Sequence, residues 1–271
     1  MIGIERLTHL IKLVLLTAYL KGEKPVSLII ISDRPESGKT QIINQFNKAN
    51  KVAIVTDATA FGIWRDFHKR LEDNEINHLL FTDFLTAISR QKSTVDSLIT
   101  TLNPLIEEGL AELHTGFLQP LTIKAPHPIG VILAMIKGPF EKHKEEWANN
   151  GFLSRLLVCS YRYSDDMVKT IFRSILDSEY RGRLELRLNL PTSLQDVEMP
   201  FEMGVKVQLL FNSMKEEEKP PYGFRLLKDL RRLAMANAID NDRHAVTQKD
   251  IDMLKGLSKL LSEKYSELED V

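Results

Sequence analysis

Gly38-Lys39-Thr40 is a tripeptide whose residue types and order suit the binding of a nucleotide phosphate chain. In such a loop, backbone N–H groups face the phosphate oxygens, and the dipole of the following helix favours their negative charge. Lys39 would then reach the β- and γ-phosphates, and the Thr40 hydroxyl would bind Mg²⁺. We therefore expect ATP and Mg²⁺ as cofactors, and phosphate-binding residues Asp33, Arg34, Pro35, Glu36, Ser37, Gly38, Lys39, Thr40 and Gln41.

The segments on either side of the tripeptide predict the elements that such a loop requires. Residues 26–32 are an apolar run typical of a buried parallel strand, and residues 41–46 have helical spacing. One position departs from the pattern G-x-x-x-x-G-K-[ST], because Asp33 stands where the first glycine is expected. The alternative interpretation is an ordinary strand–turn–helix unit in which Lys39 is a surface residue.

Asp83 follows a second apolar run, residues 77–82, which predicts another strand. Because ligands of open α/β sheets lie at the carboxyl ends of the strands, we expect Asp83 to complete a Mg²⁺ site with Thr40. The alternative is that Asp83 is the N-cap of the next helix. Phe84 comes next, where hydrolytic P-loop ATPases of this layout usually carry a glutamate that polarises water, so we expect slow hydrolysis or a carboxylate from elsewhere.

The composition is that of an ordinary globular protein. The chain has 271 residues, 43% of them hydrophobic, and a formal net charge of −1, so any contact with nucleic acid must come from a local basic patch. The single cysteine, Cys159, lies in an apolar run, which indicates a buried structural thiol and a reducing cytoplasm. Charged residues interrupt the apolar segment 2–20, so we expect a packed helix there, no membrane partner and a cytoplasmic location.

Strand and helix patterns alternate through the first 160 residues. Further strands are expected at 51–56, 128–136 and 156–161, with helices between them and a hairpin at 111–124. This alternation predicts an α/β fold with a parallel sheet and helices on both faces. Helical patterns near 201–217, 223–239 and 247–265 follow, and an alternating segment at 183–190 predicts an edge strand. The predicted units are an N-terminal helix (1–24), a nucleotide-binding core (25–190) and a helical domain (200–271).

The order of these segments resembles that of AAA+ ATPases, and within them the motor domain of minichromosome-maintenance-like helicases. The resemblance spans roughly residues 25–265. Residues 33–40 are similar to the family's Walker A loop, including Pro35, and Asp83 is similar to its Walker B aspartate. Ile136 or Lys137 stands where sensor 1 usually has asparagine or threonine.

Two arginines are candidate site residues only because of this resemblance. The Leu-Ser-Arg segment that ends at Arg155 looks like the family's arginine-finger motif, and residues 223–230 look like the sensor 2 helix of its lid. The resemblance implies that Arg155 contacts the γ-phosphate of a neighbouring subunit and that Arg225 contacts it from a helical lid. The implied catalytic residues are thus Lys39, Asp83, Arg155 and Arg225.

The resemblance implies an oligomeric ATPase, in a ring such as a hexamer, that remodels or translocates on DNA as a helicase or helicase loader. Its partners would be DNA and other replication or mobile-element proteins. Local support is limited to basic residues that could equally be a solvated surface: Lys124, Arg181, Arg183, Arg187, Lys228, Arg231 and Arg232. An ATP-gated assembly or adaptor protein with little or no hydrolysis is the alternative, favoured by Phe84, and a small P-loop kinase is a weaker third.

Overall fold

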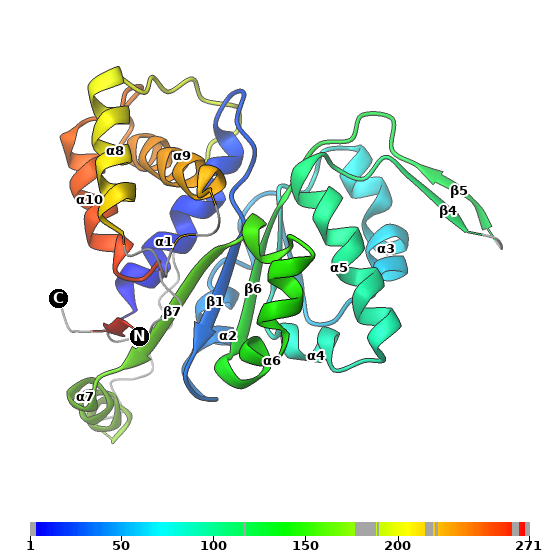
Figure 1. Ribbon diagram of the computed structural model, residues 1–271, viewed down its shortest axis with the longest axis horizontal. Helices are drawn as coiled ribbons and strands as arrows, with labels where there is room; N and C mark the ends of the chain where they lie inside the picture. Colours follow the sequence, from blue (N-terminus) through cyan, green and yellow to red (C-terminus); the bar gives the residue numbers. More distant parts are fainter. Residues whose placement is uncertain are drawn as a thin grey trace.

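The computed structural model describes residues 4–115, 118–176, 188, 190–214, 219, 222–261 and 266–268. Within this part of the chain, six parallel strands form one sheet in the order β2-β3-β6-β1-β7-β8 (Figure 1). The strands are β1 (Leu28–Ser32), β2 (Val52–Val55), β3 (His78–Phe81), β6 (Gly130–Ile136), β7 (Leu157–Tyr163) and β8 (Ser266–Leu268). The expected α/β fold with a parallel sheet is confirmed.

The central strand β1 is buried on both of its faces, which explains why its sequence is a continuous apolar run. Leu28 and Ile30 belong to one hydrophobic core, and Ile29 and Ile31 belong to the core on the other face. Cys159 on the neighbouring strand is fully buried, and this burial raises the pKa of its thiol to about 12. Such a thiol is an inert packing group, as the sequence predicted.

The helices cover both faces of the sheet. Ile42, Ile43 and Phe46, in and just after α2 (Lys39–Asn44), pack into the core that contains Leu28. The opposite core holds helices α3 (Ala60–Glu72), α4 (Phe84–Ile88), α5 (Lys92–Glu107) and α6 (Lys137–Asn149). The connections that leave β1 and β6 therefore run over opposite faces. The carboxyl ends of these two adjacent strands therefore form a topological switch point, the place at which open α/β sheets bind their ligands.

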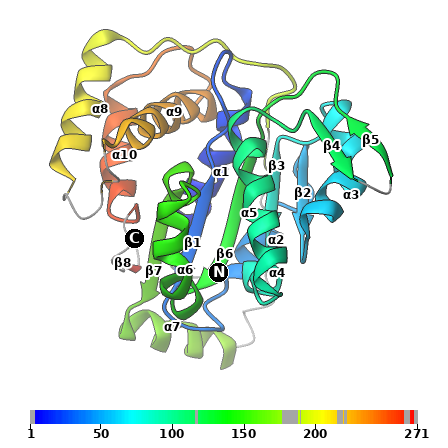
Figure 2. The ribbon, with the colours of Figure 1, turned by 45° about the vertical axis from the view of Figure 1, so that its right-hand side comes forward.

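The last three helices form a bundle with the first one (Figure 2). The bundle contains α8 (Phe201–Ser213), α9 (Phe224–Asp240) and α10 (Gln248–Ser258), and α1 (Glu5–Leu16) packs directly against α9. The N-terminal helix is thus an integral part of this bundle. The expected capping box of Thr247 and Asp250 starts α10, which ends earlier than the sequence predicted, and β8 was not predicted.

Several smaller elements complete the chain. The expected hairpin is present as the antiparallel pair β4 (Glu112–Thr115) and β5 (Leu118–Thr122), which extends away from the body of the molecule (Figure 1). Helix α7 (Asp165–Leu176) follows β7. The edge strand expected at 183–190 falls mostly outside the described residues, and Leu188 and Leu190, which are described, are not in a strand.

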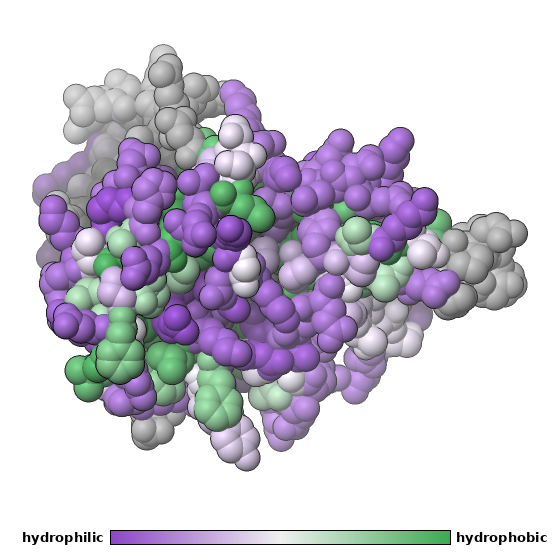
Figure 3. Space-filling view, turned by 90° about the horizontal axis from the view of Figure 1, so that it is seen from above, coloured by the Kyte–Doolittle hydropathy of each residue, from purple (hydrophilic) through white to green (hydrophobic). Residues whose placement is uncertain are grey.

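The surface of the helical bundle carries exposed hydrophobic side chains (Figure 3). Phe201, Val205 and Leu209 are exposed and are spaced four residues apart along α8, so they share one helix face. Near the start of α9, the exposed rings of Tyr222 and Phe224 stack at a centroid distance of 5.9 Å. Among the described residues, none of the helices combines the length and the hydrophobicity that a membrane crossing requires.

Candidate functional site

The loop between β1 and α2 turns sharply without a glycine at residue 33. The backbone takes positive φ at Glu36 (61°) and at Gly38 (79°), and Asp33 is not among the residues with positive φ. The glycine of the sequence pattern is therefore not needed at residue 33, because the left-handed turn comes at Glu36 instead. Left-handed turns of this kind allow successive backbone N–H groups to face one anion. A non-glycine residue at positive φ is strained, as residues at ligand-binding loops often are.

Two tyrosines on β7 hold this loop from the side. The hydroxyls of Tyr161 and Tyr163 both donate hydrogen bonds to the carbonyl oxygen of Ser37, at 2.8 and 3.0 Å. Burial raises the pKa of the Tyr161 phenol, so this hydroxyl stays protonated and keeps its role as a donor. Neither tyrosine could be identified from the sequence, because the contact joins residues more than 120 positions apart.

Lys39 lies at the first position of α2 and bends back into the loop. Its ammonium group donates to the hydroxyls of Ser32, at 2.6 Å, and Ser37, at 3.0 Å. Partial burial lowers the pKa of Lys39, and the nearby charges of Asp83 and Asp33 oppose this shift. Neutral hydroxyls are weaker partners for an ammonium group than phosphate oxygens, so the residues around Lys39 fit a phosphate ligand.

Asp83 lies at the carboxyl end of β3, close enough to Lys39 to act on its charge. One oxygen of Asp83 accepts a hydrogen bond from the Leu85 N–H at 3.1 Å, so the carboxylate is the N-cap of α4. The structure therefore contains the N-cap contact that was considered as the alternative. This hydrogen bond uses one of the two carboxylate oxygens of Asp83. Asp83 and Thr40 would be the protein ligands of Mg²⁺. Within the described part of the chain, no group of three or more His, Cys, Asp or Glu residues could hold a metal without the phosphates.

Phe84 lies in a buried aromatic cluster rather than in the site. The centroid of its ring lies 5.4 Å from that of Phe81, in an edge-on contact, and 6.0 Å from that of Trp147. The Phe84 side chain is fully buried. Ile136 pairs with Ser32 at the end of β6, so this end of β6 brings an apolar side chain to the level of the loop. Neither position therefore supplies a polar group to polarise water.

Arg155 and Arg225 lie at the opposite end of the strands from this loop, where the strands begin. Arg155 belongs to the short helix η2 (Leu153–Arg155), which immediately precedes β7. Arg225 donates to the Ser154 hydroxyl at 2.8 Å, which places the start of α9 at the same edge. Lys39 lies beyond the carboxyl end of β1, a strand of five residues that by itself spans about 13 Å. The structure thus brings the two arginines together, but it does not bring them to Lys39 of the same chain.

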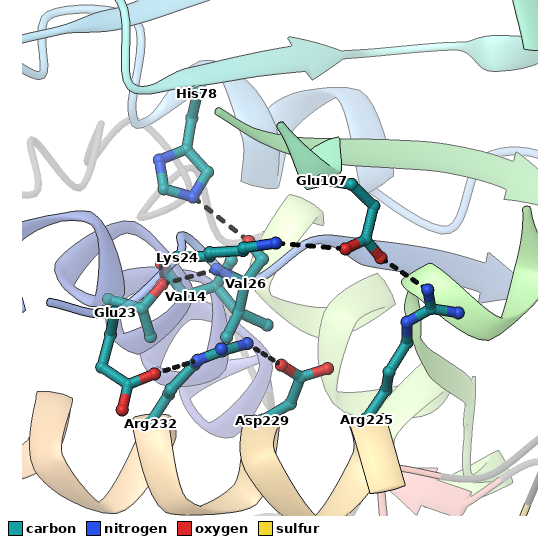
Figure 4. A network of polar contacts seen from close by, with 10 residues as sticks. Val14, Glu23, Lys24, Val26, His78, Glu107, Arg225, Asp229 and Arg232 are labelled. Carbon is teal, nitrogen blue, oxygen red and sulfur yellow. Dashed lines mark hydrogen bonds and ion pairs between the residues drawn. The ribbon is translucent and has the colours of Figure 1, made fainter. Parts of the chain in front are cut away.

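One carboxylate joins the two arginines. Oε1 of Glu107 lies 2.9 Å from Arg225 and 3.4 Å from Arg155, and its Oε2 lies 3.3 Å from Lys24. Figure 4 shows the contacts of Glu107 with Arg225 and Lys24. Beside this group, Arg232 bridges Glu23 and Asp229 at 2.8 Å each (Figure 4). Burial raises the pKa of Asp229 to about 6, against the opposing charge of Arg232. The sequence did not single out Glu107, because only the fold brings the end of α5 to the start of α9.

The basic residues considered for DNA contact are scattered. Lys124, Lys228 and Arg231 are exposed, whereas Arg232 is held in the ion pairs with Glu23 and Asp229. Arg181, Arg183 and Arg187 lie outside the described residues. Lys228 and Arg231 are three residues apart on α9 and are therefore neighbours, whereas Lys124 follows β5, whose hairpin lies far from α9 (Figure 1).

Comparison with known proteins adds no assignment. A scan against protein-family models finds no match for this chain, and a search of curated proteins finds no similar sequence. The chemistry of the site must therefore carry the functional conclusion.

Proposed function

We propose that this chain is a Mg-ATP-binding P-loop protein of the AAA+ type, which oligomerises and remodels or translocates on DNA. The observation that carries the nucleotide part is the position of Lys39. Lys39 lies at the start of α2, beside the carboxyl end of β1. Its partly buried ammonium group donates to the hydroxyls of Ser32 and Ser37 and lies near Asp83. A parallel sheet with helices on both faces is also the architecture that the AAA+ resemblance implies.

Different residues of the site would bind the phosphate chain and the metal ion. The loop backbone and Lys39 would hold the phosphate chain, and Thr40 and Asp83 would hold Mg²⁺. The bound ion would neutralise phosphate charge and orient the γ-phosphate. The tyrosine hydrogen bonds to Ser37 keep the loop in one conformation, which lowers the entropy that a ligand must overcome on binding.

The oligomeric part of the proposal draws on two observations. Arg155 and Arg225 lie at the opposite end of the strands from Lys39 of their own chain, so contact with a nucleotide would require a second copy. The resemblance implies such a contact for Arg155, whereas for Arg225 it implies contact from the lid. The exposed Phe201, Val205 and Leu209 of α8 provide an apolar surface of the kind that subunit contacts bury. The helical bundle would then take the place of the family's lid domain.

A second candidate function is supported by Phe84. An ATP-gated assembly or adaptor protein needs nucleotide binding but little hydrolysis, and the aromatic cluster excludes a carboxylate at residue 84. DNA contact has the weaker support, because the exposed basic residues are few: Lys228 and Arg231 are neighbours on α9, and Lys124 lies apart from them, after β5.

Steady-state ATP hydrolysis, measured with and without single-stranded and double-stranded DNA, separates the two functions. A DNA-stimulated rate that is lost in Lys39→Ala supports the DNA motor. Binding of ATP together with a rate equal to that of Lys39→Ala supports the assembly protein. Mass photometry with ATP, ADP or no nucleotide tests the oligomer directly, and a single monomeric species in all three samples would contradict both.

A further inference from the structure

Helix α8 carries an apolar face that points to solvent. Phe201, Val205 and Leu209 are all exposed, Phe201 by 86%, and they follow one another at intervals of four residues. Their side chains form a stripe about 12 Å long on one side of the helix. Val207 and Leu210, on the other side, are buried in the core. One side of α8 thus anchors the helix in the bundle, and the other side is left for a further contact.

Helix α7 carries a second exposed apolar face. Phe172, Ile175 and Leu176 are all exposed, Leu176 by 83%, and they lie within five consecutive residues at the end of the helix. Met167, in the first half of α7, is buried in the core and anchors the helix to the sheet. Exposed apolar side chains that gather in this way mark surfaces that contact another molecule.

The charges beside the two faces are opposite in sign. On α8 the exposed charge is that of Glu202, because Lys206 is half-buried and donates to a side chain of α10. On α7 the charges nearest the apolar residues are those of Lys169 and Arg173, since both aspartates lie in the first turn. Glu202 and Arg173 make no ion pair with another residue that the structure describes. Each face therefore carries the charge that the other face lacks.

The two faces cannot cover each other within one chain. Helix α7 follows the carboxyl end of β7, whereas α8 belongs to the helical bundle, and two views show α8 at the top of the molecule and α7 at the bottom (Figures 1 and 2). Pairing of α8 with α8 of a second copy would bring together two acidic faces, and pairing of α7 with α7 would bring together two basic ones. Only the mixed pair matches both the apolar side chains and the charges.

We propose that the apolar face of α8 in one copy of this chain packs on the apolar face of α7 in a second copy, and that Glu202 pairs with Arg173 across this contact. Because the two surfaces differ, the contact is head-to-tail, and its repetition gives a closed ring or an open filament. It deepens the oligomeric part of the proposed function, on which it rests only for self-association, because the contact itself needs no nucleotide.

Charge reversal tests this contact. The assembly of the full chain is measured by sedimentation velocity over a range of protein concentrations, without nucleotide and with millimolar Mg-ATP. Arg173→Glu and Glu202→Arg should each raise the concentration of half-assembly by about tenfold or more, since each places like charges together. The matched control is Lys69→Glu, which reverses a charge in the last turn of α3, as Arg173→Glu does in α7, and should leave assembly unchanged.

Mixing the two variants gives a sharper result. In an equimolar mixture, the altered α7 of Arg173→Glu meets the altered α8 of Glu202→Arg, and the two unaltered faces also meet. Assembly should therefore recover in the mixture, and in a chain that carries both substitutions. A mixture that stays as dissociated as its components would overturn the proposal.

Apolar variants test the direction of the contact. Leu176→Asp and Leu209→Asp, at exposed positions, should each prevent assembly. Their equimolar mixture retains one intact α7 face and one intact α8 face for each pair of chains, so it should form dimers and no larger species. Full assembly of either variant alone would overturn the proposal.

The remaining outcomes separate this contact from the nucleotide site. A wild-type chain that stays monomeric with and without Mg-ATP, or assembly that neither Arg173→Glu nor Glu202→Arg weakens, would overturn the proposal. Charge-sensitive assembly of a chain that does not bind ATP would refute the proposed function and leave this contact intact. ATP binding that is lost in Lys39→Ala, together with assembly that ignores these charges, would do the reverse.

Discussion

The hydroxyl of Tyr161 lies 2.8 Å from the carbonyl oxygen of Ser37, so a strand 124 residues further along the chain holds the loop between β1 and α2. Tyr163 reaches the same carbonyl, and the register places Tyr161 opposite Ser32, the last residue of β1. Strand β7 is thus a support for the loop as well as a part of the sheet.

Replacing both tyrosines by phenylalanine should loosen this loop. Tyr161→Phe with Tyr163→Phe leaves the Ser37 carbonyl without its two phenol donors, and we expect a loss of about 1–2 kcal/mol of stability together with weaker ATP binding. Chemical denaturation and nucleotide titration measure the two effects. Tyr222→Phe is the control, because that exposed ring only stacks on Phe224. Equal ATP affinity in the double variant and the wild type would show that the tyrosines do not order the site.

Asp83→Asn separates the capping role of this residue from its proposed metal role. Asparagine caps helices as well as aspartate does, so the stability should change by less than about 0.5 kcal/mol. The charge that would bind Mg²⁺ is lost, and we expect Mg²⁺ to enhance ATP affinity in the wild type but not in the variant. Titrations with Mg²⁺ and with a chelator give the comparison, and Asp73→Asn, at an exposed site elsewhere, is the control. An undiminished Mg²⁺ effect in Asp83→Asn would remove Asp83 from the site.

Phe84→Glu should not convert the protein into a faster ATPase. The new carboxylate would be buried between Phe81 and Trp147, and we expect a loss of about 4 kcal/mol or more of stability. Phe84→Leu should cost only about 1 kcal/mol, because it keeps the site apolar. Denaturation curves and ATPase rates check both variants. A stable Phe84→Glu protein with faster turnover would mean that residue 84 can face the nucleotide.

Much of the local structure could be predicted from the sequence. The apolar runs predict β1, β3 and β6 because strands buried on both faces are continuously apolar, and the three late helices follow from their spacing. The placement of a loop between a strand and a helix at Gly38-Lys39-Thr40 was predictable, but the strained turn at Glu36, which makes a glycine at 33 unnecessary, was not.

Long-range placement could not be predicted in the same way. Arg155 and Arg225 were each chosen from a short motif, and only the packing of α9 against the segment before β7 shows that they meet on Glu107. The same holds for α1, whose apolar residues do not say which helices cover them. Contacts of this kind depend on the order of the strands, and periodicity within one segment carries no information about that order.

Acid should destabilise the protein through His78. Burial lowers the pKa of His78 to about 4 from its ordinary value of 6.5, so the unfolded state binds the proton more readily than the folded state between these values. Stability therefore rises with pH across this window, and lowering the pH from about 6.5 to about 4 should cost about 3 kcal/mol.

The contribution of His78 is isolated by comparing the wild type with His78→Gln in urea denaturation at several pH values. Asp229 acts in the opposite direction, because its raised pKa of about 6 makes stability fall as pH rises toward that value, but it is common to both proteins and cancels. Parallel curves of unfolding free energy against pH for the two proteins would contradict this, because they would show that His78 accepts a proton as readily in the folded state as in the unfolded state.

The measurement that tests the central claim most directly is isothermal calorimetry of the full chain with millimolar Mg-ATP. We expect saturable binding of one ATP per chain in the wild type, no binding in Lys39→Ala, and unchanged binding in Lys249→Ala, where an exposed lysine of α10 is removed. No heat of binding in the wild-type protein, or equal binding in wild type and Lys39→Ala, would contradict the assignment of this loop as a nucleotide site.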